Sequence, residues 1–152
     1  MSTLIRPEIS KANDFYIPKH RYYELKHFCL QYSDWKKKSS YFDGMSKSKI
    51  DKPVIKNFIK SDMVFDAVRA REYYQSKINI VNKSCELLRN GFENYIFEGV
   101  TSGVGYNYLR TVLSIPCGKD TYYKDYHKFF WILDKMQIFE EIGEKTTPIF
   151  TF

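Results

Sequence analysis

The chain has 152 residues, a hydrophobic fraction of 43% and a formal net charge of +6 at pH 7. This length suits one medium-sized domain, or a small domain with an appendage, and the hydrophobic fraction can support a core. The sequence has no signal-peptide core and no run of about 18 apolar residues, so export and membrane spanning are not expected. We predict a cytoplasmic protein with no membrane partner.

The positive charge is concentrated in the N-terminal part of the chain. Residues 1–60 carry thirteen Lys and Arg against six Asp and Glu, whereas residues 61–100 carry five against six. Residues 101–152 carry six of each sign. Such a basic excess favours an anionic partner but says nothing about the fold.

A first helix is predicted from Pro18 to Lys38. Proline suits the first turn of a helix, and apolar residues follow at helical spacing, namely Tyr22, Leu25, Cys29 and Tyr32. The triple lysine Lys36, Lys37 and Lys38 would end this helix and complement the negative end of its dipole. These lysines are either a solvated last turn or a patch that contacts phosphates.

Residues 39–61 are rich in Ser, Lys, Gly and Pro, which is typical of a linker or mobile loop, with a short helix possible near 54–59. We therefore predict a boundary here. The predicted organisation is a basic N-terminal helix and linker (1–60), a helical unit (61–139) and a tail (140–152).

The next predicted helix is long and carries a heptad-like seam. Its apolar positions alternate by three and four residues over 64–88, with one polar interruption: Val64, Ala67, Arg71, Tyr74, Ile78, Val81, Cys85 and Leu88. Asn90-Gly91 is a good stop signal. The seam can pack against its own chain or form a homodimer, and its length does not decide between them.

Two short helices and one long helix are predicted after this stop. The short helices cover about 92–101 and 106–113, with turns at 102–105 and 114–118, and the long helix begins near Gly118 or Asp120 and runs to about Lys135. Its buried stripe is predicted to be Tyr122, Tyr126, Phe129 and Leu133, widened by Phe130.

The opposite face of this long helix is cationic. Lys124, Lys128, Trp131 and Lys135 recur at helical spacing, and Lys119 and Thr121 lie at its start. A short helix, a turn and a longer helix form a helix-turn-helix, here at 101–135. Such a helix presents polar and cationic groups to base edges at its start and lysines to phosphates further along. A plain helical bundle with a charged outer face fits the same pattern.

Three pieces of the chain carry a resemblance. "YYELKHFCLQYSDWKKK", "GVGYNYLRTVLSIPCGKDTYYKDYHKFFWILDK" and the helix between them resemble small proteins of phages and prophages of Gram-positive bacteria, similar in organisation to ArpU/RinA-type late-gene transcription regulators. The resemblance covers about 21–38 and 64–135, and the run from Ile115-Pro116-Cys117-Gly118 to Leu133-Asp134 is its most specific part.

The resemblance implies an all-α protein that ends in a helix-turn-helix like the promoter-reading region of sigma factors. It also implies a role in phage gene expression, with RNA polymerase as a possible partner. Such relatives tend to carry more Arg and Lys in the last helix, whereas this chain has Asp125 and His127 there. The N-terminal lysines would then have to contribute to DNA affinity.

No pattern indicates an enzyme, a metal site or a cofactor. The histidines His20, His27 and His127 are scattered, and Cys29, Cys85 and Cys117 form no CxxC pair, so buried thiols are expected. The glycines around Val104 lack the preceding strand and the Gly-Lys-Ser/Thr ending of a phosphate loop.

The sequence thus predicts a transcription regulator that binds double-stranded DNA. Its expected DNA-binding residues are Lys119, Thr121, Lys124 and Lys128 of the last helix with Lys36, Lys37 and Lys38. The alternative is a small phage protein that binds and inhibits a host protein complex, because the aromatic fraction of 18% suits a protein interface. RNA binding by stacked rings is a third, weaker option.

Overall fold

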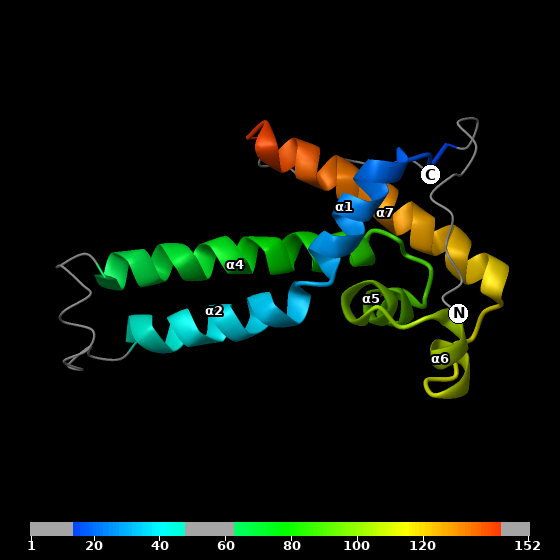
Figure 1. Cartoon of the computed structure of the whole chain (residues 1–152), viewed down its shortest axis with the longest axis horizontal. Helices are drawn as coiled ribbons and strands as arrows, with labels where there is room; N and C mark the ends of the chain where they lie inside the picture. Colours follow the sequence, from blue (N-terminus) through cyan, green and yellow to red (C-terminus); the bar gives the residue numbers. More distant parts are fainter. Residues whose placement is uncertain (1–13, 48–62, 144–152) are drawn as a thin grey trace. The chain divides into compact units, whose positions relative to one another are not determined.

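The computed structural model describes residues 14–47 and 63–143. All regular elements in these ranges are helices: α1 (Lys19–Cys29), α2 (Tyr32–Lys47), α4 (Met63–Glu86), α5 (Glu93–Ser102), α6 (Tyr106–Thr111) and α7 (Lys119–Glu141) (Figure 1). The predicted all-α fold is confirmed. None of the helices in the described ranges has the length and apolar character needed to cross a membrane.

The chain divides into two compact units. The core unit comprises Met1–Leu30 and Ile80–Phe152, and the hairpin unit comprises Gln31–Asn79. Helix α4 begins in the hairpin unit and ends in the core unit. The predicted domain ranges 1–60, 61–139 and 140–152 follow a different division and stay a prediction.

In the hairpin unit, α2 lies beside the N-terminal part of α4 (Figure 1). Arg71 donates a hydrogen bond to Asp43 at 2.9 Å, and the Ser39 hydroxyl donates to the Gln75 side chain at 3.3 Å. The ring of Phe42 stacks on that of Tyr74, with the centroids 6.2 Å apart. Most of these contacts use residues 39–43, which the sequence had indicated as a linker.

These contacts explain why the prediction of one helix over 18–38 is wrong. Helix α1 ends at Cys29, and α2 begins at Tyr32 and continues to Lys47. Lys36–Lys38 therefore lie inside α2, where they do not complement the end of a helix dipole. Side chains of residues 39–43 contact α4, and this packing outweighs their weak helix propensity. The possible short helix at 54–59 lies outside the described residues.

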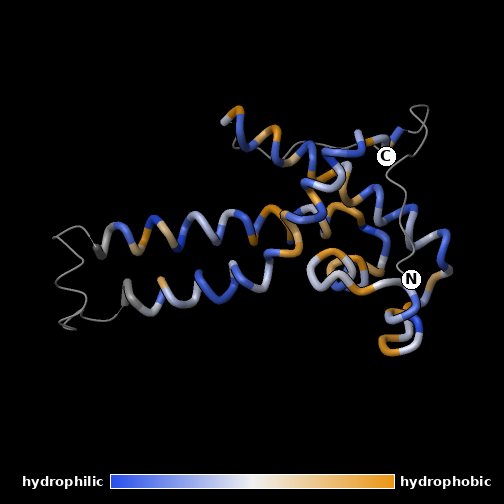
Figure 2. The backbone as a smooth tube through the Cα atoms, viewed as in Figure 1, coloured by the Kyte–Doolittle hydropathy of each residue, from blue (hydrophilic) through white to orange (hydrophobic). Residues whose placement is uncertain are grey.

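The core unit is built from α1, α5 and α7, which contact one another, and from α6, which contacts α5. The predicted stripe on α7 is confirmed, since all five of its residues are buried: Tyr122, Tyr126, Phe129, Phe130 and Leu133. Helices α1 and α5, which contact α7, contribute further buried residues, including Tyr22, Leu25, Ile96 and Val100. Figure 2 shows hydrophobic residues concentrated on α5, whereas α2 is mostly hydrophilic.

Helix α1 is joined to α7 by one polar cluster. The Nε of Arg21 donates to the Asp134 carboxylate at 2.6 Å, and its Nη2 donates to the Gln137 side chain at 2.9 Å. Arg21 also pairs with Glu24 in its own helix. This cluster lies in the second half of α7, which extends to Glu141 rather than ending near Lys135.

Helices α5 and α7 approach closely at a glycine. A Cβ atom at Gly99 would collide with the Tyr122 hydroxyl and lie 3.3 Å from that ring's Cζ. The fold therefore needs glycine at this point of α5, although glycine weakens a helix interior. This contact sets the distance between α5 and the start of α7.

The seam of α4 is buried over much of its length. Ala67, Ile78, Val81, Cys85 and Leu88 are each at most 5% exposed, while Arg71 and Tyr74 are half-buried. The regular helix ends at Glu86, and Gly91 takes a left-handed conformation with φ of +85°. Pairing of the seam between two chains stays a prediction.

Candidate nucleic-acid interface

The segment between α6 and α7 is a defined turn. Ser114 has a left-handed φ of +54°, the Ile115 amide donates to the Leu109 carbonyl at 3.0 Å, and the Tyr106 hydroxyl donates to the Cys117 carbonyl at 2.7 Å. The Ile115 side chain is buried. These contacts fix the backbone that leads into α7, whose N-cap is Gly118.

The first turns of α7 present three of the predicted DNA-binding residues. Lys119, Thr121 and Lys124 are all exposed. Thr121 and Lys124 are three residues apart, so they lie on the same side of the helix. That side is opposite the buried residues Tyr122 and Tyr126. The structure therefore holds these groups on a supported helix rather than on a loop.

A groove adjoins the start of α7. It has a volume of about 560 Å³ and lies between α6, the turn and Lys119. Asn107, Arg110 and Lys119 are among its lining residues, and none of the lining residues is acidic. Asn107 and Arg110 are both exposed and are three residues apart on α6. Sequence reasoning missed both as site residues, although this spacing within a short amphipathic helix was a usable signal.

Further along α7, the predicted outer face is partly covered. The Lys128 ammonium lies 5.7 Å from the centroid of the Phe15 ring, and Trp131 meets the same ring edge-on at 5.4 Å. Lys128 and Trp131 are half-buried. Lys135 lies over Trp131 at 5.5 Å and is 3.8 Å from the Asp134 carboxylate. The accessible cationic surface of α7 is therefore concentrated in its first two turns.

The three lysines of the N-terminal patch belong to the hairpin unit and are all exposed. Lys38 forms an ion pair with Asp34 at 3.0 Å, and this hydrogen bond and charge raise the pKa of Lys38. The Lys38 ammonium also lies 5.5 Å from the Tyr74 ring, and Lys36 lies 6.0 Å from the Tyr32 ring. These lysines thus belong to a different unit from the lysines of α7.

Asp125 and His127, which depart from the expected basic helix, are both partly withdrawn from the solvent. Asp125 is half-buried and accepts a hydrogen bond from the Asn90 side chain at 3.2 Å. His127 is half-buried beside the rings of Tyr22 and Tyr126. Burial lowers the pKa of His127 to about 4, so the imidazole is neutral at pH 7.

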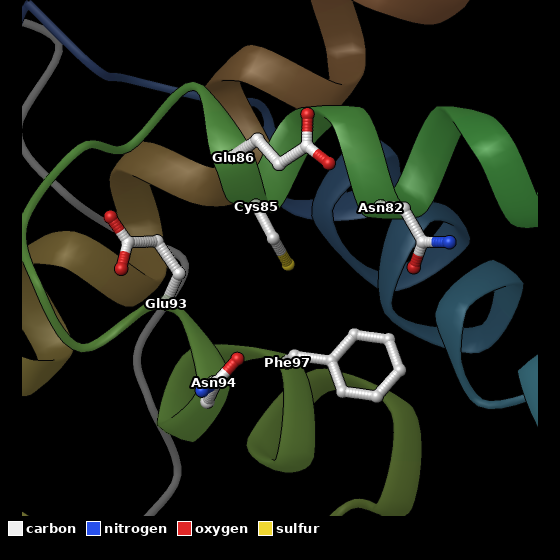
Figure 3. A pocket seen from close by; sticks show the side chains of 6 residues that line it. All are labelled: Asn82, Cys85, Glu86, Glu93, Asn94 and Phe97. Atoms are coloured by element: carbon white, nitrogen blue, oxygen red, sulfur yellow. The ribbon is translucent and has the colours of Figure 1, made fainter.

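A second cavity, of about 490 Å³, lies where α4 ends and α5 begins, and the sulfur of Cys85 points into it (Figure 3). Burial, with smaller effects from the charges of Glu93 and Glu86, raises the pKa of Cys85 to about 12. The thiol is therefore protonated at neutral pH, which disfavours a nucleophilic role.

The other cysteines and possible metal ligands add no chemical site. Cys29 is buried like Cys85, as expected for structural thiols, whereas Cys117 is partly exposed. Within residues 14–47 and 63–143, no three His, Cys, Asp or Glu side chains gather in a way that could hold a metal ion.

Comparison of the chain with protein-family models, curated proteins and solved structures gives no match.

Proposed function

We propose that this protein is a DNA-binding transcription regulator of phage or prophage genes, which reads a promoter with the start of α7. The observation that carries the proposal is the exposed set Lys119, Thr121 and Lys124 beside a groove that contains Arg110 and no acidic side chain. A long helix whose first turns carry such groups suits the major groove, where side chains reach base edges and phosphates.

Each group has a distinct task in this proposal. Lys124 and Thr121 lie on the outward side of α7 and would contact base edges. Arg110 and Lys119 lie at the groove and would contact the phosphate backbone, which positions the helix. Lys36–Lys38 would add affinity for any duplex, because phosphate neutralisation does not depend on sequence.

The resemblance to ArpU/RinA-type regulators supports the same function. A regulator of this kind would act in the bacterial cytoplasm and would affect RNA polymerase at phage promoters. The most specific part of the resemblance is the run from Ile115 to Asp134, which begins in the turn before α7 and continues through much of that helix.

The test is binding of the whole protein to a duplex from its own genomic neighbourhood, with unrelated duplex as competitor, at two salt concentrations. We expect a preference for the neighbouring duplex that persists at the higher salt. Lys124→Ala should weaken specific binding by about tenfold or more and non-specific binding much less, because a base contact contributes about 1–3 kcal/mol. Lys135→Ala is the matched control, since Lys135 lies further along the same helix and contacts Trp131.

Two results would contradict the proposal. One is equal weakening of specific and non-specific binding by Lys124→Ala, which would make Lys124 a phosphate contact only. The other is the absence of any preference between duplexes at both salt concentrations.

A second function, binding and inhibition of a host protein complex, is favoured by one observation. Tyr108, Val112 and Leu113 are 45%, 57% and 37% exposed at the end of α6. Adjacent exposed apolar side chains are typical of protein-binding surfaces. Binding centred on them would depend weakly on salt, whereas DNA affinity falls steeply as salt rises. Capture of a host protein that is lost in Val112→Asp would favour this second function.

A further inference from the structure

The core unit contains a third cavity, distinct from the groove beside Lys119. Its volume is about 400 Å³, and its walls come from the end of α1, the end of α5, the turn at 103–105, the start of α6 and the first half of α7. Pockets for small ligands typically have volumes of about 300–1,000 Å³. The cavity is therefore large enough for one small molecule.

Tyrosine rings dominate the side chains of this cavity. Five of them line it: Tyr106, Tyr108, Tyr122, Tyr123 and Tyr126. Tyr123 is half-exposed, and its ring centroid lies 5.0 Å from that of Tyr122 and 6.0 Å from that of Tyr126. Such a cluster offers ring faces and edges to a planar aromatic group.

Three glycines also line the cavity. Gly99, Gly103 and Gly105 all line the cavity, and a Cβ at Gly105 would meet no atom within 4 Å. The space that a side chain would take is therefore open at Gly105, whereas the Tyr122 hydroxyl covers Gly99. A flat ligand can lie against a wall of this kind at close approach.

The charge on the side chains that line the cavity is positive. Lys26 is the only charged side chain among the lining residues, and no carboxylate lines the cavity. Within the described part of the chain, Lys26 is half-buried and forms no ion pair. A cation that has no counter-ion among the described residues, at the edge of an aromatic pocket, favours a ligand that carries negative charge.

We infer that this cavity binds a small planar aromatic anion, a ring system bearing a carboxylate or a phosphate, with the ring among Tyr106, Tyr123 and Tyr126 and the anionic group at Lys26. The inference is independent of DNA binding, since Lys119, Thr121 and Lys124 do not line the cavity. A carboxylate and a nucleotide phosphate share this chemistry, and the probes below separate them.

The experiment is titration of the whole protein, followed through the backbone amide signals of Gly103 and Gly105 in ¹⁵N-edited NMR spectra. One probe set is 2-naphthoate, its neutral analogue 2-naphthalenemethanol, and cyclohexanecarboxylate, which has the charge without the aromatic ring. The other set is adenosine 5′-monophosphate, adenosine and inorganic phosphate. We expect saturable shifts with 2-naphthoate, adenosine 5′-monophosphate or both, and much weaker effects from the analogues that lack ring or charge.

Variants locate the site. Lys26→Met keeps the aliphatic stem and should weaken binding of the anion about tenfold or more, while binding of the neutral ring is unchanged. Tyr123→Leu should weaken both. Lys135→Met is the matched control and should bind like the parent, because Lys135 does not line the cavity. Thermal unfolding of each variant checks that it is folded.

Three outcomes would overturn the inference. The first is the absence of a saturable shift at about 1 mM of either anion, a concentration that corresponds to the weakest affinity worth assigning. The second is an equal effect of Lys26→Met and Lys135→Met on the affinity for the anion. The third is a set of shifts that leaves the Gly103 and Gly105 signals unaffected. If Tyr123→Leu does not fold, Lys26→Met and the glycine signals still decide the result.

Discussion

Two buried tyrosines show how much a single hydroxyl can matter in this core. The Tyr106 hydroxyl donates to the Cys117 carbonyl at 2.7 Å and holds the turn before α7. The Tyr122 hydroxyl is buried against Gly99 and has no hydrogen-bond partner among the described residues. A buried polar group without a partner destabilises the folded state, whereas a satisfied one contributes modestly.

Replacement of each tyrosine by phenylalanine should therefore change the free energy of unfolding in opposite directions. Tyr122→Phe removes an unsatisfied group, so we expect the free energy of unfolding to rise by about 1 kcal/mol. Tyr106→Phe removes a hydrogen bond and leaves the Cys117 carbonyl unpaired, so the free energy of unfolding should fall by about 1 kcal/mol. Urea denaturation measures both. Equal destabilisation by the two substitutions would show that the Tyr122 hydroxyl is satisfied after all.

His127 gives the core unit a pH dependence. Its pKa is lowered to about 4 by burial, while an unfolded histidine titrates near 6.5. Between these values the unfolded chain binds the additional proton, so the stability that depends on neutral His127 is fully present above about pH 6.5 and is lost as the pH falls toward 4.

We expect the parent protein to lose more stability between pH 7.5 and pH 5 than His127→Phe does. Denaturation of both proteins at the two pH values provides the comparison, because the titration of all other groups cancels in the difference. An identical loss in both proteins would mean that His127 titrates with an ordinary pKa.

Among the helices, the close approach of α5 and α7 depends on Gly99. Alanine in a helix interior is normally more favourable than glycine by about 1 kcal/mol. Here the new methyl group would collide with the Tyr122 hydroxyl. Overpacking of this kind typically costs about 1–3 kcal/mol. The collision should therefore outweigh the gain in helix propensity.

We expect Gly99→Ala to lower the free energy of unfolding by about 1 kcal/mol or more, and to be less harmful when combined with Tyr122→Phe. A double-mutant cycle measured by urea denaturation gives the coupling between the two sites. Gly105→Ala is the matched control and should be nearly neutral, since its methyl group meets no atom within 4 Å. Additive effects of Gly99→Ala and Tyr122→Phe would exclude the proposed collision.

The presence of the helices was easier to predict from the sequence than the residues at which they begin and end. The stripe of α7 was predictable because Tyr122, Tyr126 and Phe129 follow the helical period without interruption. The break between Cys29 and Tyr32 was not predictable, because the apolar spacing continues across it. The helical state of residues 39–47 depends on contacts with Gln75, Arg71 and Tyr74, which are distant in the sequence.

The candidate site was predictable in part for the same reason. Exposure of Thr121 and Lys124 follows from their positions opposite the buried stripe, and Lys119 is exposed as the first residue of α7. The cover that Phe15 places over Lys128 and Trp131 comes from a segment more than a hundred residues away in sequence. No local pattern contains that contact.

For the whole molecule, the division into two units separates two sets of cations. The hairpin unit carries Lys36–Lys38, and the core unit carries Arg110, Lys119 and Lys124. Neutralised phosphates release counter-ions, so each lysine that contacts a phosphate steepens the dependence of DNA affinity on salt.

Replacement of Lys36, Lys37 and Lys38 by glutamine should therefore weaken specific and non-specific DNA binding equally. The slope of log affinity against log salt should become shallower by about 2 to 3 if all three contact phosphates. Because Lys38 is paired with Asp34, the lower value is expected. Binding titrations over a range of salt measure the slope, and an unchanged slope would remove the hairpin unit from the DNA contact.

The pairing of Arg21 with Asp134 spans 113 residues, and this separation has a consequence for the order of events during synthesis. Helix α1 is synthesised well before α7, whose His127 and Phe130 rings contact Tyr22. The hairpin unit consists of neighbouring segments and can form in the interval, which shortens the loop to be closed. Assembly of the core unit is therefore a late step, and until then the apolar face of α1 is open to chaperones and to aggregation.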